Sequence, residues 1–140
     1  MFLKNKIFKI TLFTCLFVIS CVTNDLEQIK SPNVIYILAD DLGYGDLACY
    51  NKKSKIKTPN IDKLASEGMM FTDMHSTSSV CTPTRYSILT GEYAWRTRMK
   101  SGVLWSYGPL MIPDEKETIS KLFKKKNYNT AVIGKWHLGL

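Results

Sequence analysis

Apolar residues gather in three short runs along this chain, separated by segments with a helical pattern. The runs cover residues 33–39, 69–76 and 129–134, and the first of them, "NVIYILA", is nearly continuous and rich in β-branched side chains. Continuous apolar runs of this length are typical of strands that are buried on both faces of a parallel sheet. We therefore predict a strand at each of the three positions.

A helix is predicted between the first two runs. Thr58 is suited to the N-cap position and Pro59 to the first helical position, while Gly68 is a typical helix end. Three apolar residues at helical spacing give this helix an apolar face: Ile61, Leu64 and Ala65.

Two further helices are predicted between the second and third runs. One starts near Pro83 and continues to about Thr90, where Gly91 should stop it. The other covers residues 114–128, with acids at its start and lysines at its end, as the helix dipole favours. Its expected buried face consists of Ile119, Leu122 and Phe123.

The order of these elements is strand, helix, strand, helix, helix, strand, which predicts an α/β fold with a mostly parallel sheet. Residues 92–113 show no clear period and predict a long surface loop, a feature that is often functional. We consider two interpretations of this loop, a wall of a substrate site and simple local packing. The side chains in question are Trp95, Arg96, Arg98 and Trp105.

The first part of the chain has the pattern of an export signal. Of the formal net charge of +7, three lysines fall in the first twenty residues, ahead of an apolar stretch at 10–20 that is too short to span a bilayer. The "VISC" at 18–21 resembles a bacterial lipobox, in which Cys21 would be lipidated; an ordinary secretory signal is the alternative. We expect a signal peptide at 1–20, a tether at 21–32, and export to the periplasm or cell surface with a lipid anchor in the membrane. The remaining charge forms no basic stripe with interleaved aromatic residues, which argues against nucleic-acid binding.

Polar clusters follow the predicted strands. Asp40 and Asp41 come directly after the first strand, and Lys135 and His137 come after the third. A third cluster, at 81–85, opens the second helix. Each cluster alone can be interpreted without a functional site: the aspartates as a turn, the cysteine as a structural residue, and the lysine and histidine as solvated surface. The carboxyl ends of parallel strands share one sheet edge, so together the clusters predict carboxylates, a nucleophile and cations at one hydrolytic site.

Four segments of the chain resemble the type I sulfatase family, from Pro32 to Leu140. "CTPTRYSILTG" at 81–91 resembles the first sulfatase signature, and "YNTAVIGKWHLG" at 128–139 resembles the second. "PNVIYILADDLGYGD" and "TPNIDKLASEGMMFTDMH" are similar to the family's opening strand and the segment after it. Two departures, Thr84 for a commoner serine and Asn127 for glycine, touch no catalytic position.

The resemblance implies an alkaline-phosphatase-like fold, in which residues 33–140 are the N-terminal part of a catalytic domain with a mostly parallel sheet sandwiched by helices. It also implies that a maturation enzyme oxidises Cys81 to Cα-formylglycine, whose hydrate attacks the sulfur of a sulfate ester. Asp40 and Asp41, together with residue 81, would hold Ca²⁺ or Mg²⁺. The remaining catalytic residues implied are Arg85, Lys135 and His137.

The implied enzyme is a sulfuric ester hydrolase, arylsulfatase-like, acting on a sulfated small molecule or glycan. Family members take further metal ligands from later in the chain, so the 140 residues alone are expected to be inactive. Two alternatives stay open: a phosphodiesterase or phosphonate hydrolase of the same superfamily, and a secreted binding protein without catalysis. The sequence does not identify the sulfate ester.

Overall fold

The computed structural model describes residues 31–105 and 107–140. The chain divides into two units, Met1–Leu38 and Ala39–Leu140. In the first unit only residues 31–38 are described, and they form an exposed loop segment. The predicted signal peptide, Cys21 and most of the predicted tether lie outside the described residues. No helix in the described part of the chain is both long enough and apolar enough to cross a membrane.

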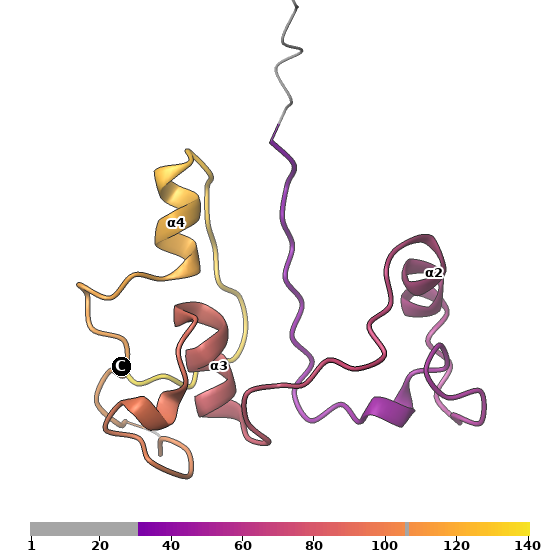
Figure 1. The fold of residues 1–140 in the computed structure, drawn as a ribbon, viewed down its shortest axis with the longest axis horizontal. Helices are drawn as coiled ribbons and strands as arrows, with labels where there is room; N and C mark the ends of the chain where they lie inside the picture. Colours follow the sequence, from indigo (N-terminus) through magenta and orange to yellow (C-terminus); the bar gives the residue numbers. More distant parts are fainter. Residues whose placement is uncertain (1–30, 106) are drawn as a thin grey trace, which may run out of the picture. The chain divides into compact units, whose positions relative to one another are not determined.

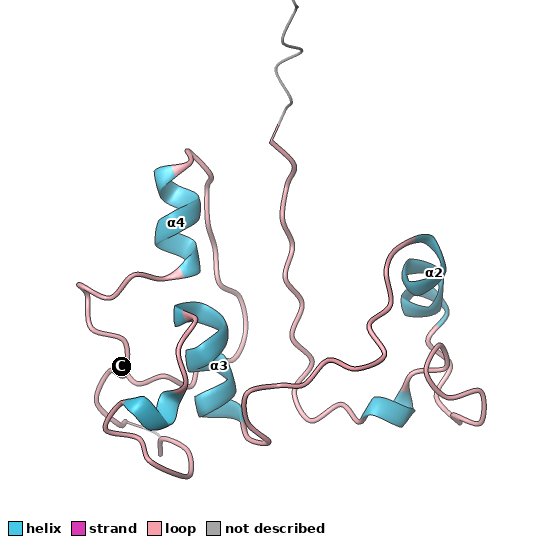
Figure 2. Cartoon of the chain, in the orientation of Figure 1, coloured by secondary structure: helices cyan, strands magenta, loops and turns pink. Residues whose placement is uncertain are grey.

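The second unit is built from short helices joined by loops (Figure 1). Its elements are η1 (Tyr44–Asp46), α2 (Pro59–Glu67), α3 (Cys81–Thr90), η2 (Ala94–Arg96) and α4 (Ile119–Lys125). Figure 2 shows helices and loops but no strand in the described residues.

The prediction of three strands is therefore wrong for this structure. Residues 33–39, 69–76 and 129–134 lie in loops and turns. A strand is defined by its hydrogen bonds to a neighbouring strand, and these runs form no ladder with one another within residues 31–105 and 107–140. Their apolar side chains are accordingly uncovered, with Ile35 84% and Ile133 97% exposed.

Helix α2 starts and ends as the sequence predicts, between Pro59 and Gly68. Thr58 occupies the N-cap position, but its hydroxyl makes no capping bond; it donates to Asp62 Oδ1 at 3.0 Å and accepts the N–H of Ala48 at 3.2 Å. The threonine therefore ties the helix to the loop before it.

Helix α3 also matches its prediction. It runs from Cys81 to Thr90, and the next residue, Gly91, has a left-handed φ of 70° that only glycine adopts readily. The N–H of Gly91 donates to the carbonyl of Ser87 at 2.8 Å, which closes the last turn.

Helix α4 is shorter than the predicted 114–128, and its expected buried face is wrong. Thr118 is the N-cap, and its hydroxyl accepts the N–H of Lys121 at 3.3 Å, so the helix starts there and not among the acids. Ile119 and Leu122 are exposed. Phe123 packs edge-on against Tyr128, with ring centroids 5.0 Å apart.

The buried core lies between α3, residues 92–113 and the last residues of the chain. Its buried apolar members are Tyr86, Ala94, Met111, Ile112 and Leu138. The long loop thus supplies three of the five core residues, and its C-terminal part is tied to the chain end by the N–H of Met111, which donates to the carbonyl of Leu138 at 2.9 Å. This arrangement holds the start of α3 beside residues 135–140.

Candidate active site

Asp40 is the centre of a cluster of charged side chains. Arg85 Nη2 donates to its Oδ1 at 2.9 Å, and Lys135 Nζ donates to its Oδ2 at 2.6 Å. The hydrogen bond from Lys135 and then that from Arg85 hold the pKa of the Asp40 carboxyl below its usual value. Asp40 is therefore an anion with a cation on each oxygen.

Arg85 connects the helix to the segment that carries Lys135. Its side chain is only 12% exposed, and its Nη1 donates to the backbone carbonyl of Lys135 at 2.6 Å. Its Nε is buried and has no hydrogen-bond partner within the described part of the chain. The guanidinium thus fixes Asp40 and residue 135 relative to the first turns of α3.

Lys135 lies in a segment that is hydrogen-bonded to the first turns of α3, the helix that starts at Cys81. The hydrogen bond to Asp40 raises the pKa of the Lys135 ammonium above its usual value. Cys81 is a half-buried, free cysteine at the first position of a ten-residue helix, where the field of the helix favours an anion. A carboxylate, two cations and a thiol thus meet in one place, although up to 95 residues separate them in sequence.

The site offers the kind of oxygen ligand that Ca²⁺ or Mg²⁺ prefers. Asp40 and Asp41 are adjacent, and Asp41 is held in a left-handed conformation with a φ of 59°. Within residues 31–105 and 107–140 no third histidine, cysteine or acid completes a cluster with them. The carboxylate oxygens have the right chemistry for such a cation, but both oxygens of Asp40 already accept from Arg85 and Lys135. The six to eight oxygens that Ca²⁺ takes, roughly, would need further donors.

His137 is held at both its backbone and its ring. Its φ is 57°, its carbonyl accepts the hydroxyl of Thr82 at 3.1 Å, and its Nε2 lies 2.7 Å from the carbonyl of Leu104. Its Nδ1 is buried and has no partner among the described residues.

Sequence reasoning missed two of these contacts. Thr82 and the backbone of Leu104 were not singled out, although both hold His137. Thr82 lies inside the "CTPTR" motif, but no local pattern indicates a hydroxyl that bonds a residue 55 positions away.

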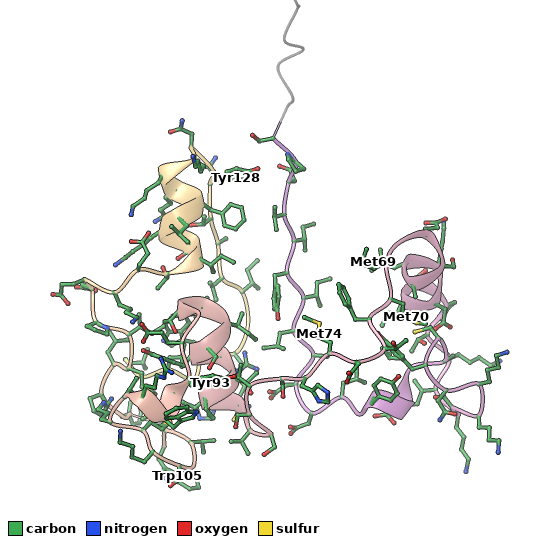
Figure 3. All side chains as sticks on the ribbon, viewed as in Figure 1. Met69, Met70, Met74, Tyr93, Trp105 and Tyr128 are labelled. Carbon is green, nitrogen blue, oxygen red and sulfur yellow. The ribbon has the colours of Figure 1, made fainter. Side chains whose placement is uncertain are left out.

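Most of the side chains singled out in the loop at 92–113 make local packing contacts, and the substrate-wall interpretation stays a prediction. Trp95 stacks on Tyr93 with ring centroids 5.5 Å apart, Arg96 lies over the Trp95 ring, and Arg98 donates to the carbonyl of Pro109, all of which is local packing. Trp105, labelled in Figure 3, is different because it is 84% exposed and follows Leu104.

Comparison with known proteins places this site in a family. The sulfatase family matches residues 32–140. The chain is 46% identical over 114 residues to an N-acetylgalactosamine-6-O-sulfatase from Bacteroides thetaiotaomicron, covering 81% of this chain and 22% of that protein. It is 44% identical over 115 residues to human arylsulfatase A, covering 82% of this chain and 22% of that protein.

A solved structure agrees with these matches. A Bacteroides thetaiotaomicron protein, described in connection with the metabolism of multiple glycosaminoglycans, superposes with a TM-score of 0.73 at 46% identity, covering 78% of this chain and 22% of that one. The predicted alkaline-phosphatase-like α/β fold class is thereby confirmed for a partial domain. The chain spans about a fifth of the length of these relatives. On a match of this extent and identity, the chain belongs to the sulfatase family.

Proposed function

We propose that the protein carrying this chain hydrolyses sulfate esters at the site around Asp40 and Cys81. The observation that carries the proposal is the convergence of Asp40, Arg85 and Lys135 at the first turns of α3. Membership of the sulfatase family supports the reaction type. A carboxylate, two cations and a nucleophile position are the groups that an anionic ester needs for hydrolysis.

Two groups complete this proposal. A formylglycine made from Cys81 by a maturation enzyme would supply a geminal hydroxyl as nucleophile. A divalent cation, Ca²⁺ or Mg²⁺, would supply Lewis acidity; Asp40 and Asp41 would hold it together with an oxygen that residue 81 gains as formylglycine, since Cys81 itself forms no such cluster with them in the described residues.

The other side chains then have separate tasks. Arg85 holds Asp40 and the backbone of residue 135 in place, which keeps the carboxylate aimed at the site. Lys135, whose raised pKa keeps it charged, would bind a sulfate oxygen and counter negative charge in the transition state. His137 would contact the hydrated residue 81 and also counter negative charge in the transition state.

The substrate, in this proposal, is a sulfated small molecule or a sulfated glycan. The names of the relatives cover both, because one is an N-acetylgalactosamine-6-O-sulfatase and another a human steryl-sulfatase, 46% identical over 114 residues. We further propose that the protein is exported and lipid-anchored through Cys21, on the basis of the lipobox-like "VISC".

The experiment compares two cysteine variants of the whole protein, co-expressed with a maturation enzyme and supplied with Ca²⁺. Cys81→Ala should lower the turnover of a chromogenic aryl sulfate by about 10⁴-fold or more, since it removes the nucleophile. Cys49→Ala is the matched control, because Cys49 is the other free, half-buried cysteine in the described residues.

Mass spectrometry of the peptide that contains residue 81 should show loss of sulfur and gain of an aldehyde. Full activity with an unmodified Cys81 thiol would overturn the mechanism. Turnover of an aryl phosphate diester without turnover of the sulfate would replace the proposed reaction with the phosphodiesterase alternative.

A further inference from the structure

Thr82 lies next to the nucleophile position, but its hydroxyl faces away from solvent into a ring of hydrogen bonds. Its side chain is fully buried. The hydroxyl donates to the carbonyl of His137 at 3.1 Å and accepts the N–H of Leu104 at 3.2 Å. One hydroxyl therefore joins the first turn of α3 to two loops that are distant in sequence.

The ring of hydrogen bonds closes through the imidazole of His137. The carbonyl of Leu104 lies 2.7 Å from His137 Nε2, and a carbonyl can only accept, so Nε2 must carry the proton. In the neutral ring this leaves Nδ1 unprotonated, and Nδ1 is the ring nitrogen that is buried without a partner within the described residues. The carbonyl of Leu104 thus determines the tautomer, and the hydroxyl of Thr82 holds the backbone of both Leu104 and His137.

The backbone of His137 has a conformation that needs contacts from neighbouring residues to hold it. Its φ of 57° is unusual for a residue other than glycine, and conformations of this kind persist only where surrounding contacts determine them. The contact to Thr82 acts on the carbonyl of this residue, and the contact to Leu104 acts on its ring.

We propose that Thr82 is a positioning residue that holds His137 in the Nε2–H tautomer and leaves Nδ1 as its working atom. The inference rests on the proposed function in so far as His137 takes part in sulfate ester hydrolysis. Thr82 itself touches no reacting atom; it acts through the backbone of residues 104 and 137.

The first test is spectroscopic and does not depend on turnover. The whole protein is labelled with ¹⁵N-histidine, and the His137 signals are assigned by their loss in His137→Gln. The ¹⁵N shifts of the neutral ring should show a protonated Nε2 and an unprotonated Nδ1. A protonated Nδ1 in the wild type would overturn the proposal, and this result needs no variant at Thr82 to fold.

The second test uses Thr82→Val, which keeps the shape of the side chain and removes the hydroxyl. We expect kcat to fall by about 10²-fold with little change in KM, because a misplaced His137 imidazole would stabilise the transition state less while leaving substrate binding in the ground state unaffected. Thr82→Ser keeps the hydroxyl and should restore most of kcat. Rates are expressed per mole of formylglycine, measured by mass spectrometry, because Thr82 lies inside the maturation motif.

Thr118→Val is the matched control for a purely structural effect. Thr118 is also buried and also uses its hydroxyl on a backbone N–H, but this hydroxyl caps α4, where its hydrogen bonds join Lys121 and Ser120. It should lower stability without changing kcat. Wild-type kcat in Thr82→Val, or an equal loss in Thr82→Ser, would overturn the positioning role. If the wild type does not hydrolyse sulfate esters, the proposed function fails, while the tautomer of His137 compared between the wild type and Thr82→Val still decides the role of Thr82.

Discussion

Replacement of Gly139 by alanine tests how tightly the loop at 104–111 is packed against the chain end. A Cβ at this position would lie 2.6 Å from the carbonyl oxygen of Pro109, 2.7 Å from that of Gly108 and 2.7 Å from Leu110 Cα. All three atoms belong to the backbone, so a rotation of a side chain cannot relieve the contact. Gly139 also has a positive φ of 90°.

The expected cost has two parts. The positive φ costs an alanine about 1–2 kcal/mol, since its Cβ approaches the neighbouring carbonyl. Overpacking against fixed atoms costs about 1–3 kcal/mol more. The free energy of unfolding should therefore fall by roughly 2–5 kcal/mol, the sum of these two ranges.

Gly102→Ala separates the cost of the positive φ from the cost of overpacking. Gly102 has a φ of 74°, and a Cβ there would meet nothing within 4 Å, so only the backbone cost of about 1–2 kcal/mol applies. The assay is denaturant unfolding of the whole protein, followed by tryptophan fluorescence, because Trp136 Nε1 donates to the carbonyl of Gly139 at 2.9 Å. Equal unfolding midpoints for the two variants would refute the close packing of residues 108–110 against Gly139.

Three further predictions concern other parts of the chain. Replacing Cys21 by alanine should release the exported protein from membranes in a fractionation assay, and a wild type that is already soluble after export would contradict the lipobox interpretation. Residues 22–140 expressed alone with a maturation enzyme should be inactive on an aryl sulfate with Ca²⁺ and poorly soluble, because Asp40 and Asp41 supply only part of a Ca²⁺ site and the apolar runs are uncovered; turnover comparable to an intact sulfatase would contradict this. The ion pair between Lys116 and Glu92 should make stability depend on alkaline pH, because the hydrogen bond to Glu92 raises the pKa of Lys116 above 10.5. The stabilising effect of the ion pair is present below pH 10.5 and is lost as the pH rises through the higher pKa that Lys116 has in the folded state. The difference in unfolding midpoint between the wild type and Glu92→Gln should therefore vanish above that folded-state pKa. A difference that persists at higher pH would contradict this.

The sequence by itself determined the features that local chemistry controls. The limits of α2 follow from Pro59 and Gly68, and the end of α3 follows from Gly91, because these residues restrict or free the backbone at their own positions. The motifs at 81–91 and 128–139 also indicated the family, which the comparisons confirmed.

Only the tertiary structure decided which side chains meet. Asp40 and Lys135 are 95 residues apart, and no local pattern states that they share a hydrogen bond. The same holds for Thr82 and His137, whose contact depends on the loop between α3 and the chain end. The predicted strands failed for a related reason: an apolar run such as 33–39 has the composition of a strand, but it becomes one only when a neighbouring strand supplies hydrogen bonds, and no such neighbour lies within the described residues.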